Sequence, residues 1–148
     1  MKTYELPAET KAATGYTHKV ILDHTDLTNA STNTAQTIEL LSVAAGDVVH
    51  SAAVKVVTHF ENTADTAFNS TTLIVGDDGS TNRFVTSTQV NDNDGSKVTY
   101  KAHTNTAPHA YTAANTVDAV VTPAAGNLAA LNAGEVHIFL GVNKLTSL

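Results

Sequence analysis

The segment GDVVHSAAVKVVTHF, residues 46–60, constrains the fold more than any other part of the chain. Most of its even positions are apolar, from Val48 through Val54 and Val56 to Phe60, whereas polar residues interrupt the odd positions. A period of two with many β-branched residues is typical of a strand that has one face on the core. The segment therefore predicts a long central strand of a sheet.

This strand begins at the motif AGD (a small residue, a glycine and an acid) at residues 45–47, and a similar motif, AGE, occurs at residues 133–135. The second motif precedes an apolar run over residues 136–142. We expect the two runs to form the two halves of a sandwich core. The residues that we place in this core share strand parity and are Val48, Val54, Val56, Ile138 and Leu140.

Shorter alternating or β-branched runs fill most of the remaining sequence. The Asp-Gly pairs at residues 78–79 and 94–95 are hairpin signals, and they predict a three-strand meander. Only residues 127–131 suggest a helix within this part of the chain. The predicted strands cover residues 16–22, 34–43, 46–60, 71–75, 83–90, 97–102, 117–122 and 136–142.

These segments predict an all-β, single-domain antiparallel β-sandwich of about eight strands. Eight strands allow a jelly roll, but their number does not fix the order in which they pair. An immunoglobulin-like sandwich stays open, because the missing Cys and Trp remove its sequence signature and not its architecture.

Residues 1–15 contain Pro7 and Gly15 and follow neither a strand period nor a helix period over any length. A helical turn over residues 8–13 fits their composition, but helices this short are marginal in water. We therefore predict an extended N-terminal arm, residues 1–15, that is mobile in the isolated protein, and a β-sandwich domain over residues 16–148.

Length and composition limit the classes of function. A chain of 148 residues suits one core, and with 5% aromatic residues and no Trp that core must be built from Val, Ile, Leu and Ala. The net charge of −6 argues against nucleic acid as a partner, because nucleic-acid binding requires a clustered basic face. The N-terminus lacks the apolar segment of a signal peptide, and no apolar run approaches the roughly 18 residues of a membrane span. We expect synthesis in the cytoplasm and no membrane partner.

Seven histidines invite a metal hypothesis, and His103 and His109 bracket a loop that could bring them close. Zinc would require at least one more converging ligand, and the absence of Cys removes thiolate sites. The acidic clusters at residues 77–79 and 92–95 resemble fragments of calcium loops, but a complete ligand pattern is missing. Hairpin turns explain both clusters, so we expect no metal and no cofactor.

Catalytic motifs are equally incomplete. The chain has no GxSxG elbow and no phosphate-binding loop, and its Ser and Thr residues are too numerous to single out a nucleophile. We expect no enzymatic activity and no small-molecule substrate.

Phe139 lies on the opposite parity from Ile138 and Leu140, so it is either a second-layer core residue or an interface anchor.

Four segments together resemble small virion structural proteins of tailed bacteriophages, in particular head-decoration or cement proteins. They are AAGDVVHSAAVKVVTHF, TLIVGDDGSTNRFV, AANTVDAVVTP and LNAGEVHIFLGVNKL, and the resemblance extends over residues 34–145. It implies a β-sandwich of the jelly-roll type on the outer surface of the capsid, commonly as a homotrimer. It further implies that the partner is the major capsid protein, whose neighbouring subunits such a protein clamps together.

Specific surface residues follow from combining this resemblance with strand parity. Val49, Val57 and Phe139 fall on the nominally outward parity, and we predict that they line the oligomer interface. Tyr4 and Leu6 are the side chains with which the arm could anchor itself to the capsid as an added strand, and Pro7 would limit pairing beyond them.

Two other functions remain open. A phage tail or fibre module could use the same fold at a fibre tip to bind a receptor. A carbohydrate-binding sandwich would use exposed aromatic rings, and here only four Tyr residues are available for that purpose.

Overall fold

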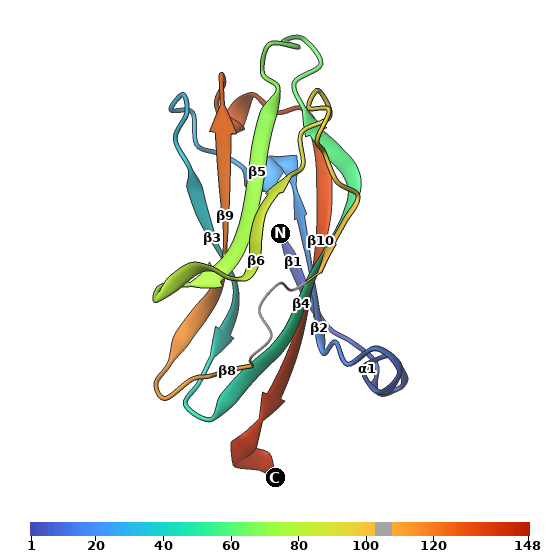
Figure 1. Ribbon diagram of the computed structural model, residues 1–148, viewed down its shortest axis with the longest axis vertical. Helices are drawn as coiled ribbons and strands as arrows, with labels where there is room; N and C mark the ends of the chain where they lie inside the picture. The colour runs from blue at the N-terminus through green and yellow to red at the C-terminus, as the bar shows by residue number, and fades with distance from the viewer. Residues whose placement is uncertain (103–107) are drawn as a thin grey trace.

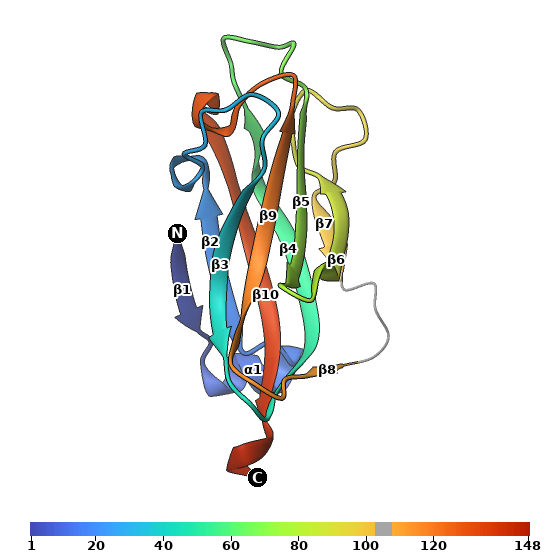
Figure 2. The same ribbon diagram turned by 90° about the vertical axis from the view of Figure 1, so that its left-hand side faces the viewer.

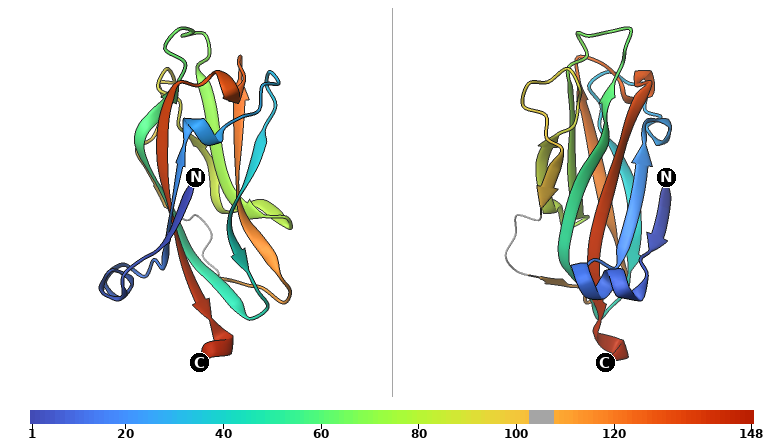
Figure 3. Two further views of the ribbon diagram at one scale, coloured as in Figure 1. Left: turned by 180° about the vertical axis from the view of Figure 1, so that it is seen from behind. Right: turned by 90° about the vertical axis from the view of Figure 1, so that its right-hand side faces the viewer.

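The computed structural model describes residues 1–102 and 108–148, and it shows two antiparallel sheets packed face to face (Figure 1). Sheet A contains, in spatial order, β1 (Lys2–Glu5), β2 (His18–Asp23), β10 (Ala133–Lys144) and β4 (Asp47–Glu61), with β7 (Tyr100–Ala102) and β8 (His109–Ala110) both pairing along the far side of β4. Sheet B contains β3 (Gln36–Val43), β9 (Asn115–Ala124), β5 (Ser70–Asp77) and β6 (Ser80–Gln89). Figure 2 shows sheet B toward the viewer, and the right-hand view of Figure 3 shows sheet A.

Helical segments are few and short in the part of the chain that the structure describes. The α-helix α1 (Ala8–Thr14) follows β1, and single-turn 3₁₀ segments occur at η1 (His24–Asp26), η2 (Leu128–Ala130) and η3 (Leu145–Ser147). The 3₁₀ segment η2 falls within the region where the sequence suggested a helix. Among the described residues, no helix is long and apolar enough to cross a membrane.

The strand order is that of a jelly roll. Strand β2 pairs with β10, β3 with β9, β4 with β7 and β8, and β5 with β6, so early strands pair with late ones in a nested series. The chain thus resembles one long antiparallel ribbon, turned back at the β5–β6 hairpin and wound so that successive pairs alternate between the two sheets. The prediction of an all-β antiparallel sandwich is confirmed, and the jelly-roll order distinguishes it from an immunoglobulin-like one.

The core lies between the sheets and is built mainly from β-branched and aliphatic side chains. Of the predicted core residues, Val54, Val56, Ile138 and Leu140 are buried. Three phenylalanines, Phe60, Phe68 and Phe84, supply the largest fully buried side chains, while most of the remaining core is Val, Leu and Ala, as the composition required.

Val48 is the exception among the predicted core residues, because β4 contains a β-bulge. Gly141 pairs with Ser51 and Val142 pairs with Val49, which leaves His50 as an extra residue in β4. A bulge of one residue reverses the side-chain parity beyond it. Val49 is therefore fully buried at 0% exposure, whereas Val48 is only half-buried.

Strands β4 and β10 are neighbours in one sheet and do not form opposite halves of the core, which corrects the expectation drawn from the motifs AGD and AGE. The AGD motif forms a turn, with Gly46 at φ 88°, whereas Gly134 of the AGE motif lies inside β10 at φ 140° beside a register shift. The two halves of the core come instead from sheet A and sheet B, because successive strand pairs of the jelly roll alternate between the two sheets.

The first Asp-Gly hairpin is confirmed, since Asp77 pairs with Ser80 across residues 78–79. Neither residue of this turn has a positive φ, so the Asp77 side chain, which accepts from Gly79 N and Ser80 N, organises it. The predicted meander is wrong at its third strand. Strand β7 pairs with β4 in sheet A, because the segment after β6 crosses from one sheet to the other.

Residues 1–15 do not stand apart from the sandwich as the sequence suggested. Strand β1 pairs antiparallel with β2, and Thr3 Oγ1 donates to Leu40 O of sheet B at 3.3 Å. The N-terminal amine forms an ion pair with Asp26, and Lys11 pairs with Glu5. Backbone pairing requires few apolar side chains, which is why the polar composition of this segment did not indicate it.

Candidate assembly surfaces

The outer face of sheet A gathers most of the residues that the sequence assigned to binding. Side chains directly opposite one another in an antiparallel ladder share a face. The strand register therefore places two rows across this sheet, which are Tyr4, Lys19, Phe139, Ala53 and Ala102 in one row and Lys2, Ile21, His137, Lys55 and Tyr100 in the other.

The predicted arm residues lie at one edge of this face. Tyr4 is exposed on β1, beside Lys19 of β2. Leu6 follows the strand, and its backbone N–H donates to Thr17 O at 2.8 Å. The arm thus presents Tyr4 outward while its backbone is engaged with the sandwich.

Phe139 lies beneath the arm. Its ring centroid is 5.8 Å from that of Tyr16, and α1 crosses the lower part of sheet A in the right-hand view of Figure 3. Leu6, Thr10, Thr14, Tyr16 and Phe139 line a hollow of about 260 Å³ between α1 and the sheet. Phe139 is therefore half-buried by its own chain, which places it between the two roles that parity left open.

The other two predicted interface residues have opposite fates. Val49 is buried in the core beyond the bulge and cannot face a neighbouring subunit, whereas Val57 is 48% exposed. Strand β7 brings Tyr100, 71% exposed, to the position opposite Lys55. Strand parity in the sequence did not single out Tyr100 for this surface, although its outward direction follows once β7 is paired with β4.

The outer face of sheet B differs in chemistry. Its central rows contain Thr37, Val120 and Ile74, followed by Glu39, Asp118 and Gly76. Asp118 is buried at 7% exposure, although strand alternation directs it outward. This face carries acidic and β-branched side chains and no aromatic ring in these rows.

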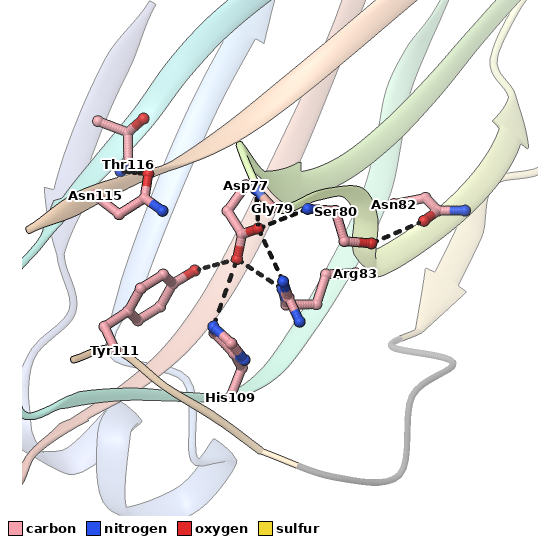
Figure 4. Close-up of polar contacts among 9 residues, drawn as sticks. All are labelled: Asp77, Gly79, Ser80, Asn82, Arg83, His109, Tyr111, Asn115 and Thr116. Atoms are coloured by element: carbon pink, nitrogen blue, oxygen red, sulfur yellow. Dashed lines mark hydrogen bonds and ion pairs between the residues drawn. The ribbon is translucent and has the colours of Figure 1, made fainter. Parts of the chain in front are cut away.

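A buried carboxylate lies between the end of β5 and the segment that follows β8 (Figure 4). Asp77 is 2% exposed, and it accepts from Arg83 Nε at 2.7 Å, Tyr111 Oη at 2.9 Å and the two turn amides. His109 Nε2 lies 3.8 Å from the same carboxylate. These donors surround the carboxylate, so Asp77 holds the β5–β6 hairpin to the segment after β8.

The electrostatics agree with this role. Burial alone would raise the pKa of Asp77, but hydrogen bonds from Arg83, Tyr111 and Ser80 outweigh burial and hold that pKa below its usual value. Burial and the neighbouring carboxylate raise the pKa of Tyr111, so its hydroxyl remains a donor.

The histidines do not assemble a metal site in the part of the chain that the structure describes. His59 Nε2 lies 3.1 Å from Val98 O, and His137 Nε2 lies 2.7 Å from Glu135 Oε1. No group of three or more His, Asp or Glu side chains within residues 1–102 and 108–148 is arranged to hold a metal ion. His103 lies outside the described residues, so its pairing with His109 stays a prediction.

The fold is similar to chains in two solved bacteriophage capsids. One belongs to the acidic stable capsid structure of Helicobacter pylori bacteriophage KHP30, with a TM-score of 0.50 and 15% identity over 94% of this chain and 90% of that chain. The other belongs to the capsid asymmetric unit of cyanophage Pam1, with a TM-score of 0.56 and 19% identity over 84% of this chain and 78% of that chain. No protein-family model matches the sequence, and no curated protein matches it. At these identities the similarity concerns the fold.

Proposed function

We propose that this chain is a non-enzymatic structural protein of a bacteriophage capsid that decorates the outside of the head and stabilises contacts between major capsid subunits. The observation that carries the proposal is the jelly-roll fold, which is similar over most of the chain to chains in two bacteriophage capsid structures. The region that resembles decoration proteins in sequence, residues 34–145, contains β3 to β10, that is, all of sheet B and the part of sheet A other than β1 and β2.

Sheet A provides the surface for such a role. Tyr4, Val57 and Tyr100 leave large apolar or aromatic side chains exposed on one side of the molecule, and exposed aromatic residues are enriched where proteins meet. We assign Val57 and Tyr100 to contacts between subunits of a homotrimer, with Phe139 as a partly covered neighbour, and we assign Tyr4 and Leu6 of the arm to contacts with the major capsid protein.

Antibody labelling of virions tests the location. An antibody raised against this chain, applied to intact phage and viewed by electron microscopy, should decorate the heads. Labelling confined to tails or fibre tips would replace this proposal with the tail-module alternative.

A binding assay tests the activity itself. Heads assembled without this protein should bind the purified chain until a fixed number of copies is reached, and the decorated heads should withstand a higher temperature before releasing DNA. Light scattering should give three times the chain mass of 15.4 kDa, either in solution or after release from heads. Heads that neither bind the chain nor gain stability would contradict the proposal.

A further inference from the structure

Asp118 is a carboxylate buried on a face that should be solvated. It lies on β9 between Val117 and Ala119, which face the core, so its side chain projects from the outer face of sheet B. Across the strands it lies between Glu39 of β3 and Gly76 of β5.

The surrounding backbone explains its burial. A Cβ at Gly76 would lie 2.1 Å from Ser80 O and 2.4 Å from the carbonyl carbon of Thr81, so the end of the β5–β6 hairpin folds directly over this glycine. The hairpin forms one wall beside Asp118, and the exposed Glu39 stands on the opposite side. Asp118 thus lies below the level of its neighbours on this face, and we call the position bounded by Glu39, Asp118 and the hairpin end over Gly76 the recess.

One oxygen of the Asp118 carboxylate is unsatisfied. Asp118 Oδ1 is buried and has no hydrogen-bond partner among residues 1–102 and 108–148. Burial raises the pKa of Asp118, the charges of Asp78, Glu39 and Asp77 raise it further, and a hydrogen bond from the Thr116 side chain opposes this rise only in part. A buried carboxylate oxygen without a donor, in a group with no cation beside it, destabilises the protein that contains it. The isolated chain therefore holds an acidic group that a positive partner would satisfy.

No basic group of the same sheet can serve. The strands of sheet B, all of which the structure describes, contain no Lys, and their one Arg, Arg83, binds Asp77. All lysines lie in sheet A, in α1 or in the segment that leads to β7, at positions Lys2, Lys11, Lys19, Lys55, Lys97, Lys101 and Lys144.

We propose that the recess formed by Glu39 and Asp118 receives a lysine or arginine side chain of the capsid protein on which this chain docks. The inference rests on the proposed function, since it takes the capsid as the partner. A long basic side chain fits because its ammonium or guanidinium group can reach a recessed carboxylate while its methylene stem packs on apolar surface. Val120 and Ile74, in the adjacent row of the same face, provide that surface.

The expected consequence is an opposite effect on stability and on binding. Asp118→Asn keeps the shape of the side chain and removes the unpaired charge, so the free protein should melt at a higher temperature than the wild type. The same variant should bind heads about tenfold or more weakly, because the cation of the partner loses its carboxylate. Glu39→Gln, at an exposed position, should weaken binding in the same direction without affecting folding. Both variants should show a weaker dependence of head binding on salt.

Asp65→Asn is the matched control. Asp65 is exposed in the loop after β4, and it accepts from Ala67 N, a bond that the amide oxygen of Asn can replace. It removes the same charge elsewhere and should change neither melting temperature nor head binding.

Each outcome of the binding assay is informative. If the wild type binds heads and Asp118→Asn binds them equally well, the recess is not a docking site, although the proposed function stands. If the wild type fails to bind heads, the proposed function falls and this inference falls with it. A variant that loses self-association but keeps its affinity for heads would identify a second copy as the partner. If Ca²⁺ or Mg²⁺ stabilised the wild type and not Asp118→Asn, the ligand would be a metal ion. Either of these last two results would also overturn the inference.

Discussion

The hydroxyl of Tyr111 donates a 2.9 Å hydrogen bond to Asp77 Oδ2, and this bond joins the two sheets of the sandwich. Asp77 ends β5 in sheet B, whereas Tyr111 follows β8, which pairs with β4 in sheet A. The backbone of Tyr111 is itself held, because its N–H donates to Asp47 O and its carbonyl accepts from Gly46 N. One buried side chain thus connects the hairpin at which the ribbon turns back with the start of the central strand.

Removing this connection should destabilise the fold. Tyr111→Phe deletes one hydrogen bond to a charged acceptor and should lower the free energy of unfolding by about 1.5 to 3 kcal/mol. Asp77→Asn should cost about 3 kcal/mol or more, since it leaves the Arg83 guanidinium without its buried carboxylate. Urea denaturation measures both effects. The adjacent, exposed Asp78→Asn is the control and should stay within about 0.5 kcal/mol of the wild type, and equal losses at Asp77 and Asp78 would contradict the assigned role.

The two buried carboxylates should respond to acid in opposite ways. The folded-state pKa of Asp77 lies below the unfolded value of about 4, so its stabilisation is complete above that value and is lost as the pH falls toward the folded pKa. The pKa of Asp118 is raised, so its protonation adds stability as the pH falls from the folded value to about 4. Unfolding free energies between about pH 3 and 7 should therefore fall less steeply with acid in Asp77→Asn. Asp118→Asn should lack the increase in unfolding free energy that the wild type gains above about pH 4 as acid protonates Asp118. If both variants showed the pH profile of the wild type, this assignment would be refuted.

Alternation along the strands was sufficient to predict the sandwich and four of five core residues, but it failed at Val48 and Val49. The inserted residue at His50 leaves no mark in composition, and it reverses the parity of only the first residues of β4. Parity alone therefore placed the half-buried Val48 in the core and the fully buried Val49 at an oligomer interface, which Val49 cannot reach.

A pair of substitutions tests this reversal. Val49→Ala should lower the free energy of unfolding by about 1 to 3 kcal/mol, because a fully buried side chain is lost and a cavity remains. Val48→Ala should cost clearly less, as its side chain is only half-buried. Denaturant titration of the two variants decides between the bulged and the regular strand, since a regular strand would reverse the order.

The candidate recess at Asp118 could not be predicted from the sequence. In its local context, TVDAVV, Asp118 alternates like any solvent-facing strand residue. Its burial depends on the pairing of β9 with β5, which places Gly76 and the hairpin end over it beside Asp118, although they lie about forty residues earlier in the chain. The strand order has the same origin, because each pairing in the nested ribbon except that of β5 with β6 joins distant segments.

Substitution of Gly134 in β10 tests how closely this strand packs against Phe60. A Cβ at Gly134 would lie 2.1 Å from Cδ1 of the buried Phe60 ring, and its φ of 140° disfavours any side chain. Gly134→Ala should therefore cost about 2 kcal/mol or more. Gly95→Ala is the matched control, because no atom lies within 4 Å of the added carbon. Thermal unfolding should separate the two variants, and a Gly134→Ala protein as stable as the control would show that Phe60 can move aside.

Residues 1–15 contribute more to the sandwich than their composition alone suggested. Deleting residues 2–12 removes β1 and most of α1, so it exposes the backbone edge of β2 and uncovers Phe139. An unpaired edge next to an exposed aromatic ring favours association between chains. The truncated protein should melt several degrees below the full chain and should scatter more light on standing. Tyr4→Ser is the control: it alters an exposed side chain but keeps the pairing of β1, so it should leave stability intact while lowering occupancy on heads. A truncated protein that melts with the full chain would show that β1 adds no stability to the sandwich, and only the proposed contact of Tyr4 and Leu6 with the capsid would then remain as the role of this segment.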